Sequence, residues 1–363
     1  MKNFLFSKLS FKMCLPLAAV ICASFFGYSQ SSYAWGNRGH HAICESAVYL
    51  VKDPVLRQFL LSRTHVMGYL CNIPDTHWKG MSPDLTKHGN PSHFVDTDLF
   101  DRPLSEVPTD YREVVKLFTG YQAKVAEKPI QWVPAEIGSI WWRADQFWRR
   151  MVEFATLAKS QPLPANRIED RDEKFPFNSS VHQMVINMGL MGHFVGDVTM
   201  PLHNSLDYDG YKSGHGGLHS FYEEICVSEM APNIVPRILT RAKEQKTMKF
   251  NQQATLFLAM RELSELGRKD IPLMVKADKI LKPSELKTDK GMQIKTPAER
   301  PSAAIAFKSF EKLILSQMGR SALTLAKAWD AAYEKAGKPD LSKYKSFAYP
   351  HAPDFVMPDY YSN

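Results

Sequence analysis

Apolar side chains recur at helical spacing through most of the chain. Residues 134–160 show the pattern best, because their apolar positions return every three or four residues, as on the buried face of a helix. No stretch alternates between apolar and polar residues for long enough to predict a strand, and no internal repeat is visible. The same helical spacing predicts further helices over residues 39–51, 54–61, 106–126, 179–199, 218–229, 235–244, 252–277 and 303–336.

Two segments interrupt this pattern. Residues 282–300 are rich in Lys and Pro and predict a surface loop. The tail from Lys338 is rich in Pro and Tyr and has no period. The chain is therefore predicted to form one all-α domain over residues 35–363, preceded by a segment of a different kind.

That first segment, residues 1–34, has the composition of a secretory signal peptide. Three lysines precede an apolar run that ends near Tyr28, and Ser32 and Ala34 supply small residues before a cleavage site. A membrane anchor is the alternative, but the run is shorter than the roughly 20 residues that span a bilayer. We therefore expect cleavage after Ala34 and export to the periplasm or the medium.

Cleavage there would make Trp35 the amino terminus and change its chemistry. A free α-amino group has a lone pair that can bind a metal, which an amide nitrogen lacks. With the carbonyl oxygen of Trp35 it can form a five-membered chelate. His40 follows closely enough in the sequence to complete the same site.

The charge of the chain is mildly positive. Its formal net charge of +7 falls to +4 without the three lysines of the leader. This excess suits an anionic substrate. It is too small to indicate a dedicated nucleic-acid-binding protein.

Cysteine usage sets a limit on covalent cross-links. Two of the five cysteines lie in the leader. Cys44, Cys71 and Cys226 remain, and they allow at most one internal disulfide, whose pairing the sequence leaves open. Most of the stability must therefore come from the core and from bound metal.

Histidines and carboxylates gather in the middle of the chain. His193 and Asp197 lie four residues apart on one predicted helix, so both project from one face. His219 and Glu223 repeat this spacing on another helix, and His203 lies between the pairs. Either pair alone would indicate a surface ion pair. Three imidazoles and two carboxylates together are the ligand types that zinc requires.

Asp75 and His93 lie upstream and, taken singly, would be a loop carboxylate and a core histidine. With them the pattern resembles the zinc-dependent single-strand-specific nucleases of fungi and plants (the S-one/P-one nuclease family) and their relatives, the bacterial zinc phospholipases C. The matching residues keep the family order and are Trp35, Gly36, Gly39, His40, Asp75, His93, Phe94, Asp96, His193, Asp197, Pro201, Leu202, His203, His219 and Glu223.

The resemblance implies an all-α fold with a trinuclear zinc cluster between helices. One zinc ion would be held by Asp75, His93, His193 and Asp197. A second would be held by the amino and carbonyl groups of Trp35, by His40 and by a shared Asp197. The third would be held by His203, His219 and Glu223.

Nine ligand residues for three ions would leave open positions for water and phosphate, as a catalytic site needs. Two close cations can bind one water between them and lower its pKa, and the third can neutralise the phosphate and the departing oxygen. Asp75 is also a candidate catalytic residue, because its carboxylate could orient the attacking water.

Three further residues are candidates for binding substrate. The resemblance implies that Phe94 stacks on a base and that Asp96 bonds to the edge of that base; the alternative is a core phenylalanine and a turn-capping aspartate. The nucleases often carry a cation three residues after the aspartate that corresponds to Asp75. Here Trp78 occupies that position, and Lys79 could substitute for the cation.

The substrate stays open because Glu223 stands where the nucleases have Asp and the phospholipases have Glu. The leading prediction is an exported zinc phosphodiesterase that cleaves single-stranded DNA or RNA. The alternative is a zinc phospholipase C acting on a phospholipid surface. A third hypothesis is a zinc-binding protein that is not an enzyme. No obligate protein partner is inferred.

Overall fold

Helix α10 (Pro176–Asp197) runs through the core of the structure. Every residue from Met184 to Asp197 is buried, as expected for a helix that is apolar on all sides. Pro176 occupies its first turn, where the missing N–H costs no hydrogen bond. The computed structural model describes residues 35–230, 232–245, 255–290, 292–345 and 352–361, which all belong to one compact unit.

The described residues are mainly helical. The other α-helices are α2 (Gly36–Leu50), α3 (Pro54–Leu61), α4 (Thr64–Thr76), α5 (Pro83–Gly89), α6 (Tyr111–Phe118), α7 (Val133–Ile137), α8 (Ile140–Ser160), α9 (Arg167–Arg171), α11 (Leu218–Ser220), α12 (Cys226–Glu229), α13 (Ile234–Glu244), α14 (Leu256–Ala277) and α15 (Ala303–Lys335). Short 3-10 helices are η1 (Trp78–Gly80), η2 (Asn90–His93), η3 (Thr97–Leu99), η4 (Leu104–Glu106), η5 (Pro201–Asn204) and η7 (Leu341–Lys343), and η6 (Phe221–Ile225) is a π-helix.

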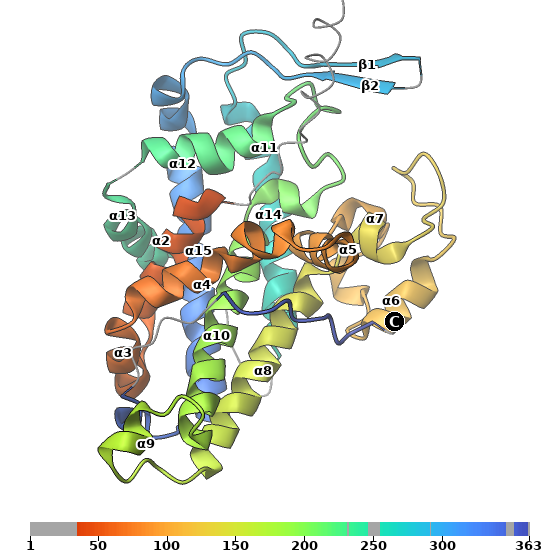
Figure 1. Cartoon of the computed structure of the whole chain (residues 1–363). Helices are drawn as coiled ribbons and strands as arrows, with labels where there is room; N and C mark the ends of the chain where they lie inside the picture. The colour runs from red at the N-terminus through yellow and green to blue at the C-terminus, as the bar shows by residue number, and fades with distance from the viewer. Residues whose placement is uncertain (1–34, 231, 246–254, 291, 346–351, 362–363) are drawn as a thin grey trace, which may run out of the picture. The chain divides into compact units, whose positions relative to one another are not determined.

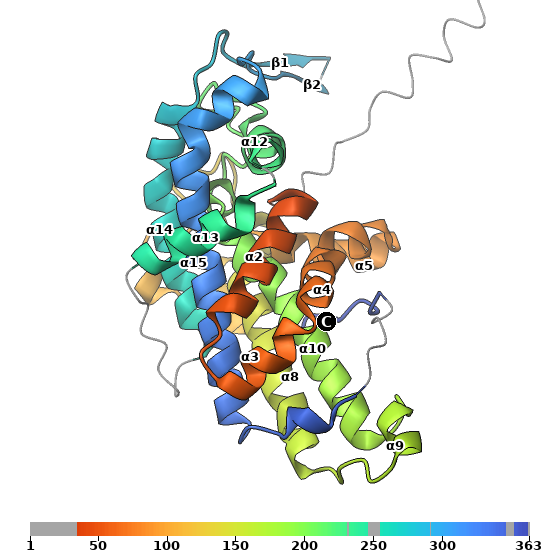
Figure 2. The same ribbon diagram turned by 90° about the vertical axis from the view of Figure 1, so that its left-hand side faces the viewer.

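Four long helices pack directly on α10. Its neighbours are α8, α4, α15 and α2, and the first of these runs beside it over most of its length (Figures 1 and 2). Helices α2 and α4 also pack on each other. The end of α10 that carries His193 and Asp197 is therefore enclosed by helices from distant parts of the sequence.

A row of glycines on α10 allows this close packing. A Cβ atom at Gly189 would lie 2.3 Å from Leu70 Cβ on α4, and one at Gly192 would lie 2.2 Å from Cys44 Sγ on α2. A Cβ atom at Gly196 would lie 2.9 Å from His40 Nδ1. Because these distances are too short for any side chain, the three glycines bring α2 and α4 onto the surface of α10.

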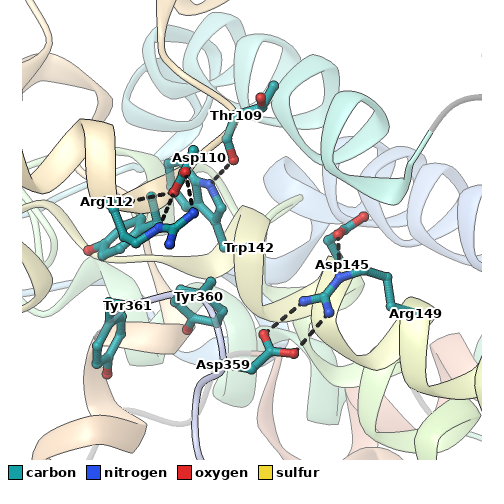
Figure 3. A pocket seen from close by; sticks show the side chains of 10 residues that line it. Thr109, Asp110, Arg112, Trp142, Asp145, Arg149, Asp359, Tyr360 and Tyr361 are labelled. Atoms are coloured by element: carbon teal, nitrogen blue, oxygen red, sulfur yellow. Dashed lines mark hydrogen bonds and ion pairs between the residues drawn. The ribbon is translucent and has the colours of Figure 1, made fainter. Parts of the chain in front are cut away.

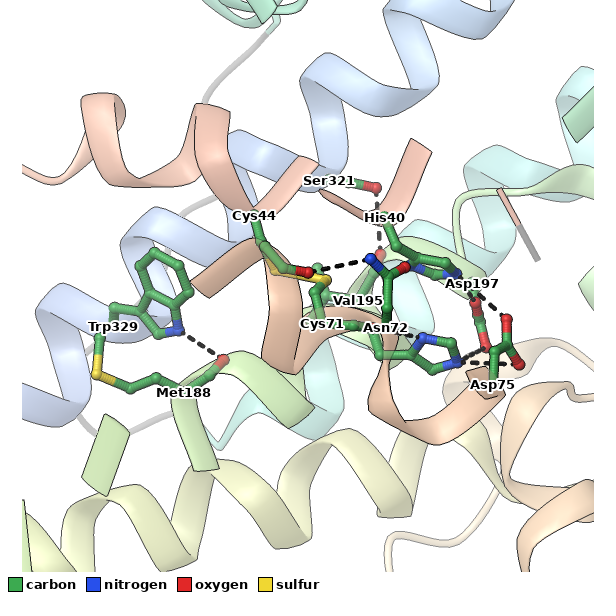
Figure 4. The surroundings of a disulfide bond; sticks show 12 residues. His40, Cys44, Cys71, Asn72, Asp75, Met188, Val195, Asp197, Ser321 and Trp329 are labelled. Atoms are coloured by element: carbon green, nitrogen blue, oxygen red, sulfur yellow. Dashed lines mark hydrogen bonds and ion pairs between the residues drawn. A yellow bond between two sulfur atoms is a disulfide. The ribbon is translucent and has the colours of Figure 1, made fainter. Parts of the chain in front are cut away.

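A disulfide joins α2 to α4 at this seam. It links Cys44 to Cys71 and leaves Cys226 as a buried free thiol, which selects one of the pairings that the sequence allows. Figure 4 shows the bond between the two helices, with His40 and Asp75 on the same side. The cross-link therefore fixes the two helices that carry these candidate ligands.

The prediction of a mainly helical domain is confirmed, and residues 54–61 form α3 with the predicted bounds. Asp53 explains this agreement, because its carboxylate accepts hydrogen bonds from two backbone N–H groups at the start of the helix. The helix predicted over residues 106–126 is too long. Asp110 caps α6 at its start, and Gly120, with a φ of 79°, lies just beyond its end.

The helix predicted over residues 134–160 is two helices, α7 and α8. Gly138 separates them with a φ of 84°. A Cβ atom at Gly138 would lie 2.2 Å from the carbonyl oxygen of Phe94, and the backbone of Gly138 forms a bridge with Val95. The break therefore makes room for the segment that carries His93.

The prediction that residues 282–300 form only a loop is wrong. They contain an antiparallel hairpin of β1 (Glu285–Asp289) and β2 (Met292–Thr296), with Glu285 opposite Thr296 and Asp289 opposite Met292. Its strands are almost entirely exposed. Without a buried face they lack the apolar alternation by which strands are predicted.

Three of the α-helices in the described chain were not predicted, namely α4, α5 and α9. Helix α4 contains Pro74 two residues before its end. Helices α5 and α9 have 7 and 5 residues, which is too short to show a helical period. The leader predicted over residues 1–34 lies outside the described residues. Within them, no helix is both long enough and apolar enough to cross a membrane.

We expect Gly192→Ala to destabilise the fold by roughly 1–3 kcal/mol, because the added methyl group must displace Cys44 or the helix that carries it. Gly80→Ala is the matched control, since nothing lies within 4 Å of a Cβ atom there. Urea unfolding of both variants measures the difference. Equal stability of the two variants would contradict the close approach of α2 to α10.

Candidate metal centre

The predicted ligands converge although they come from seven different elements. His40 lies on α2, Asp75 on α4, His93 on η2, and both His193 and Asp197 on α10. His203, His219 and Glu223 come from η5, α11 and η6. Among the described residues they make three buried groups able to hold metal ions: a first group of Asp75, His93 and His193, a second of His40, His193 and Asp197, and a third of His203, His219 and Glu223.

The first group has the spacing of ligands around one ion. His193 Nε2 lies 3.0 Å from His93 Nδ1. Each of these nitrogens lies 3.7 Å from Asp75 Oδ1. Asp197 Oδ2 lies 3.0 Å from His93 Nδ1 and 3.2 Å from His193 Nε2. Tetrahedral zinc with bonds of 2.0–2.2 Å separates its ligand atoms by about 3.4 Å, so Asp75, His93 and His193 fit one ion, and Asp197 lies beside the two imidazoles.

The third group fits equally well. His219 Nε2 lies 2.9 Å from Glu223 Oε2 and 3.1 Å from His203 Nε2. His203 Nε2 lies 3.8 Å from the same carboxylate oxygen. Glu223 lies in the π-helical segment η6. The wider turn changes the direction in which its carboxylate points, and such turns are frequent at functional sites.

The second group is built around Asp197. His40 Nε2 lies 3.1 Å from Asp197 Oδ1 and 4.0 Å from Asp75 Oδ2. The His40 ring stacks on that of His193 with centroids 4.1 Å apart. The backbone nitrogen of Trp35 lies at the third group, 3.2 Å from Glu223 Oε2, while the resemblance assigns it to the ion held by His40. The amino end of the helical domain therefore reaches the cluster, next to the third group.

Hydrogen bonds fix which nitrogen of three imidazoles faces inward. Carbonyl oxygens accept from the Nδ1–H of His193 at 2.8 Å, of His203 at 2.5 Å and of His219 at 2.7 Å. In a neutral ring Nε2 then carries the lone pair. Burial lowers and the carboxylates of Asp197 and Asp75 raise the pKa of His193, and the carboxylates prevail, so Nε2 of this ring donates to Asp197 when no metal is bound. His203 Nε2, His219 Nε2 and the Glu223 carboxyl converge, and without metal the proton of the Glu223 carboxyl lies among them. A cation can replace this proton, and the residues fit a bound metal.

Burial sets the protonation of these groups. It lowers the pKa of His93 and of His219 to about 4, which keeps both rings neutral and able to bind metal. It raises the pKa of Glu223 to about 8. Burial opposes ionisation of Asp197 as well, but His193 and the hydrogen bonds from three imidazoles hold the pKa of that carboxyl well below its usual range.

One side of the cluster reaches solvent. The side chain of Lys79 is 19 % exposed and that of His93 is 9 % exposed, while those of the other ligands are at most 1 % exposed. Lys79 Nζ lies 2.5 Å from Asp75 Oδ1. Burial lowers and the Asp75 carboxylate raises the pKa of Lys79, and the carboxylate prevails, so the ammonium stays charged. A substrate would therefore meet the cluster at these two residues.

The other two candidate substrate-binding residues follow His93 on the same segment. Phe94 is half-buried, and its carbonyl oxygen accepts hydrogen bonds from the N–H groups of Ser139 and Ile140. Asp96 is buried, and its N–H donates to the carbonyl oxygen of Ile137 at 2.7 Å. Burial and the nearby Asp98 raise the pKa of Asp96 well above its usual range.

Several supporting contacts were not predicted from the sequence. The carbonyl oxygens of Cys71, His93 and Tyr208 orient the three imidazoles, and a backbone oxygen leaves no signal in a sequence. The Tyr208 ring also packs on His219 with centroids 4.0 Å apart. The loop of Tyr208 therefore orients a candidate ligand.

A buried guanidinium lies behind the first group. Arg143 on α8 is fully buried, 4.8 Å from the Phe147 ring centroid and 5.7 Å from that of Phe194, the residue next to His193. Its Nη1 donates to Gln146 Oε1 at 2.7 Å, and burial lowers the pKa of Arg143 to about 10. The sequence interpretation assigned no role to this arginine. Its contacts support the helix turn that carries His193.

A pocket of about 380 Å³ lies elsewhere, and it contains none of the candidate ligands. Figure 3 shows its two arginines, each paired with carboxylates: Arg112 with Asp110, and Arg149 with Asp145 and Asp359. Because these charges are neutralised within the pocket, it offers no free cation for an anionic ligand.

Comparison of the chain with protein-family models gives no match, and comparison with curated proteins gives none either. Neither result assigns a family. The candidate centre is therefore supported by the residues and geometry described above.

We expect His40→Ala to lower the metal content by about one ion per chain. His193 belongs to both the first and the second group, whereas His40 serves the second group alone, so its loss removes that site. His41→Ala is the matched control, since His41 is the next residue on α2 and its side chain is 43 % exposed. Elemental analysis of both purified variants measures the content. An equal content in the two would contradict a metal site at His40.

Metal binding should also release protons. The carboxyl of Glu223, with a pKa raised to about 8, is mainly protonated at pH 7 without metal and must lose its proton to bind an ion. His93 and His219 contribute none, because their pKa values lie at about 4. Zinc titration by calorimetry in buffers of different ionisation enthalpy should therefore detect more protons released at pH 7 than at pH 9. Equal release at both would refute this protonation state.

Proposed function

We propose that the protein is a zinc-dependent phosphodiesterase that hydrolyses single-stranded nucleic acid. The observation that carries the proposal is the convergence of imidazole nitrogens and carboxyl oxygens in three buried groups, with an ammonium at the side that reaches solvent. A purely structural metal site has no need of such an opening.

The donor set favours zinc. Its atoms are imidazole nitrogens and carboxylate oxygens, without thiolates. Imidazole suits zinc, whereas magnesium and calcium prefer oxygen ligands alone. The ligand spacings of the first and third groups also fit tetrahedral coordination.

The residues of the cluster would share the work of phosphodiester hydrolysis. Zinc held by these groups supplies Lewis-acid polarisation of a phosphate oxygen and activation of a water molecule. Asp75 lies between Lys79 and His40, where its carboxylate can orient that water for attack. The Lys79 ammonium can stabilise negative charge that develops on the phosphate.

Single-stranded nucleic acid is the preferred substrate because of the residues beside the opening. Phe94 is half-buried next to His93, so part of its ring can contact a base. The adjacent buried Asp96, with its raised pKa, can donate as well as accept a hydrogen bond at the edge of a base. A base held there would bring its phosphate towards His93 and Lys79.

Zinc phospholipase C is the second candidate function, and two observations favour it. The third group contains Glu223, and the phospholipases that the sequence resembles have a glutamate at this position where the nucleases have an aspartate. The hairpin of β1 and β2 exposes Leu286, Met292 and Ile294 beside lysines, a combination that can rest on a lipid surface.

We also propose that the protein is exported and folds in an oxidising compartment. The disulfide between Cys44 and Cys71 supports this proposal, because such bonds persist mainly outside the cytosol. No obligate protein partner is proposed.

A parallel substrate assay tests the proposal. The purified protein with zinc is offered single-stranded DNA, RNA and phosphatidylcholine vesicles, and we expect release of nucleotides that a chelator abolishes. His193→Ala should reduce the rate by at least about 100-fold. Circular dichroism of that variant separates catalysis from folding, because a structural zinc protein would instead unfold.

Release of phosphocholine without nucleotides would replace the nuclease by the phospholipase. Activity that survives complete metal removal would reject both enzymes.

A further inference from the structure

One tryptophan is exposed while all the others are buried. Trp132 lies immediately before α7 and is 38 % exposed. The other six tryptophans of the chain are at most 4 % exposed and are Trp35, Trp78, Trp141, Trp142, Trp148 and Trp329. The packing of the core therefore does not account for an indole at position 132.

The backbone of Trp132 is held in place. Its N–H donates to Glu136 Oε1 at 2.7 Å, and the N–H of Gln131 donates to the same oxygen at 2.7 Å. The carbonyl oxygen of Trp132 accepts from the N–H groups of Ala135 and Glu136 at 3.1 Å. A fixed backbone presents the ring to solvent, so less conformational entropy is lost when a ligand binds to it.

A lysine on α5 lies over one face of this ring. Lys87 on α5 is exposed, and its Nζ lies 4.9 Å from the Trp132 ring centroid. No ion pair of Lys87 with a carboxylate occurs within the described part of the chain. A positive charge beside an accessible aromatic face is the combination by which proteins hold single-stranded nucleic acid, with the base on the ring and the phosphate near the cation.

The position of this pair relates it to the metal centre. Helix α5 leads directly into η2, which carries His93, and α7 is followed by Gly138, which packs on Phe94. Figure 1 shows α5 and α7 beside one another, and the contact of Lys87 with Trp132 joins them. Trp132 lies six residues before Gly138, which corresponds to about 9 Å along the axis of α7, so the indole is attached near the segment that carries Phe94.

We infer that Trp132 and Lys87 form a second base-binding subsite, which stacks a nucleotide neighbouring the one at Phe94. The inference rests on the proposed function and adds to it a preference for strands longer than a dinucleotide. Because every base has a flat face, the subsite would accept any sequence.

The test compares two substrates, a thymidine dinucleotide and a long oligothymidylate, with the zinc-loaded protein. For Trp132→Ala we expect kcat/KM on the long strand to fall about tenfold through a higher KM, with dinucleotide cleavage unchanged. Trp132→Phe should restore most of the loss, since a phenyl ring also stacks. Lys87→Ala should weaken the salt dependence of KM on the long strand. Tyr49→Ala, at an equally exposed aromatic residue on α2, is the control and should change neither substrate.

The outcomes separate the two proposals. If the unmodified protein cleaves neither substrate, the proposed nuclease function fails and the subsite fails with it. If both substrates are cleaved and Trp132→Ala lowers them equally, or lowers neither, the nuclease stands and the subsite is refuted. A loss of long-strand activity in Tyr49→Ala equal to that in Trp132→Ala would also refute it.

Discussion

The direct contact of two helices with the glycine face of α10 is the constraint on which the site depends. Gly192 and Gly196 leave no room for side chains, so α2 and α4 lie against the helix backbone. Only at this distance can His40 reach Asp197. Larger residues at these two positions of α10 would push the helices apart. The ligands that the helices carry would then form separate surface ion pairs instead of one buried cluster.

That contact creates an electrostatic problem inside an apolar core. Imidazole nitrogens and carboxyl oxygens are buried within hydrogen-bond distance of one another. Burying ionised groups without compensation costs several kcal/mol each. Carbonyl oxygens, Lys79 and paired hydrogen bonds offset part of this cost. The remainder is what a divalent cation would balance, so the fold and its ion would stabilise each other.

The sequence was informative where local chemistry decides the structure. The four-residue spacing of His193 and Asp197 predicted a shared helix face, and Asp53 marks the start of α3. Long-range effects were not visible. Helix α4 was missed, the exposed hairpin lacks an apolar face, and the π-helical turn at Glu223 has no sequence signature. Carbonyl groups that orient imidazoles can be found only once distant segments are brought together.

The Cys44–Cys71 disulfide has a consequence for the choice of metal. His40 lies one helical turn before Cys44, and Asp75 one turn after Cys71, so a covalent bond sets the separation of these two ligands. The ion therefore does not need to draw the helices together when it binds. A cage whose dimensions are set beforehand discriminates by ionic radius and preferred geometry, which affinity alone cannot do. An ion that fits poorly would be unable to reshape it.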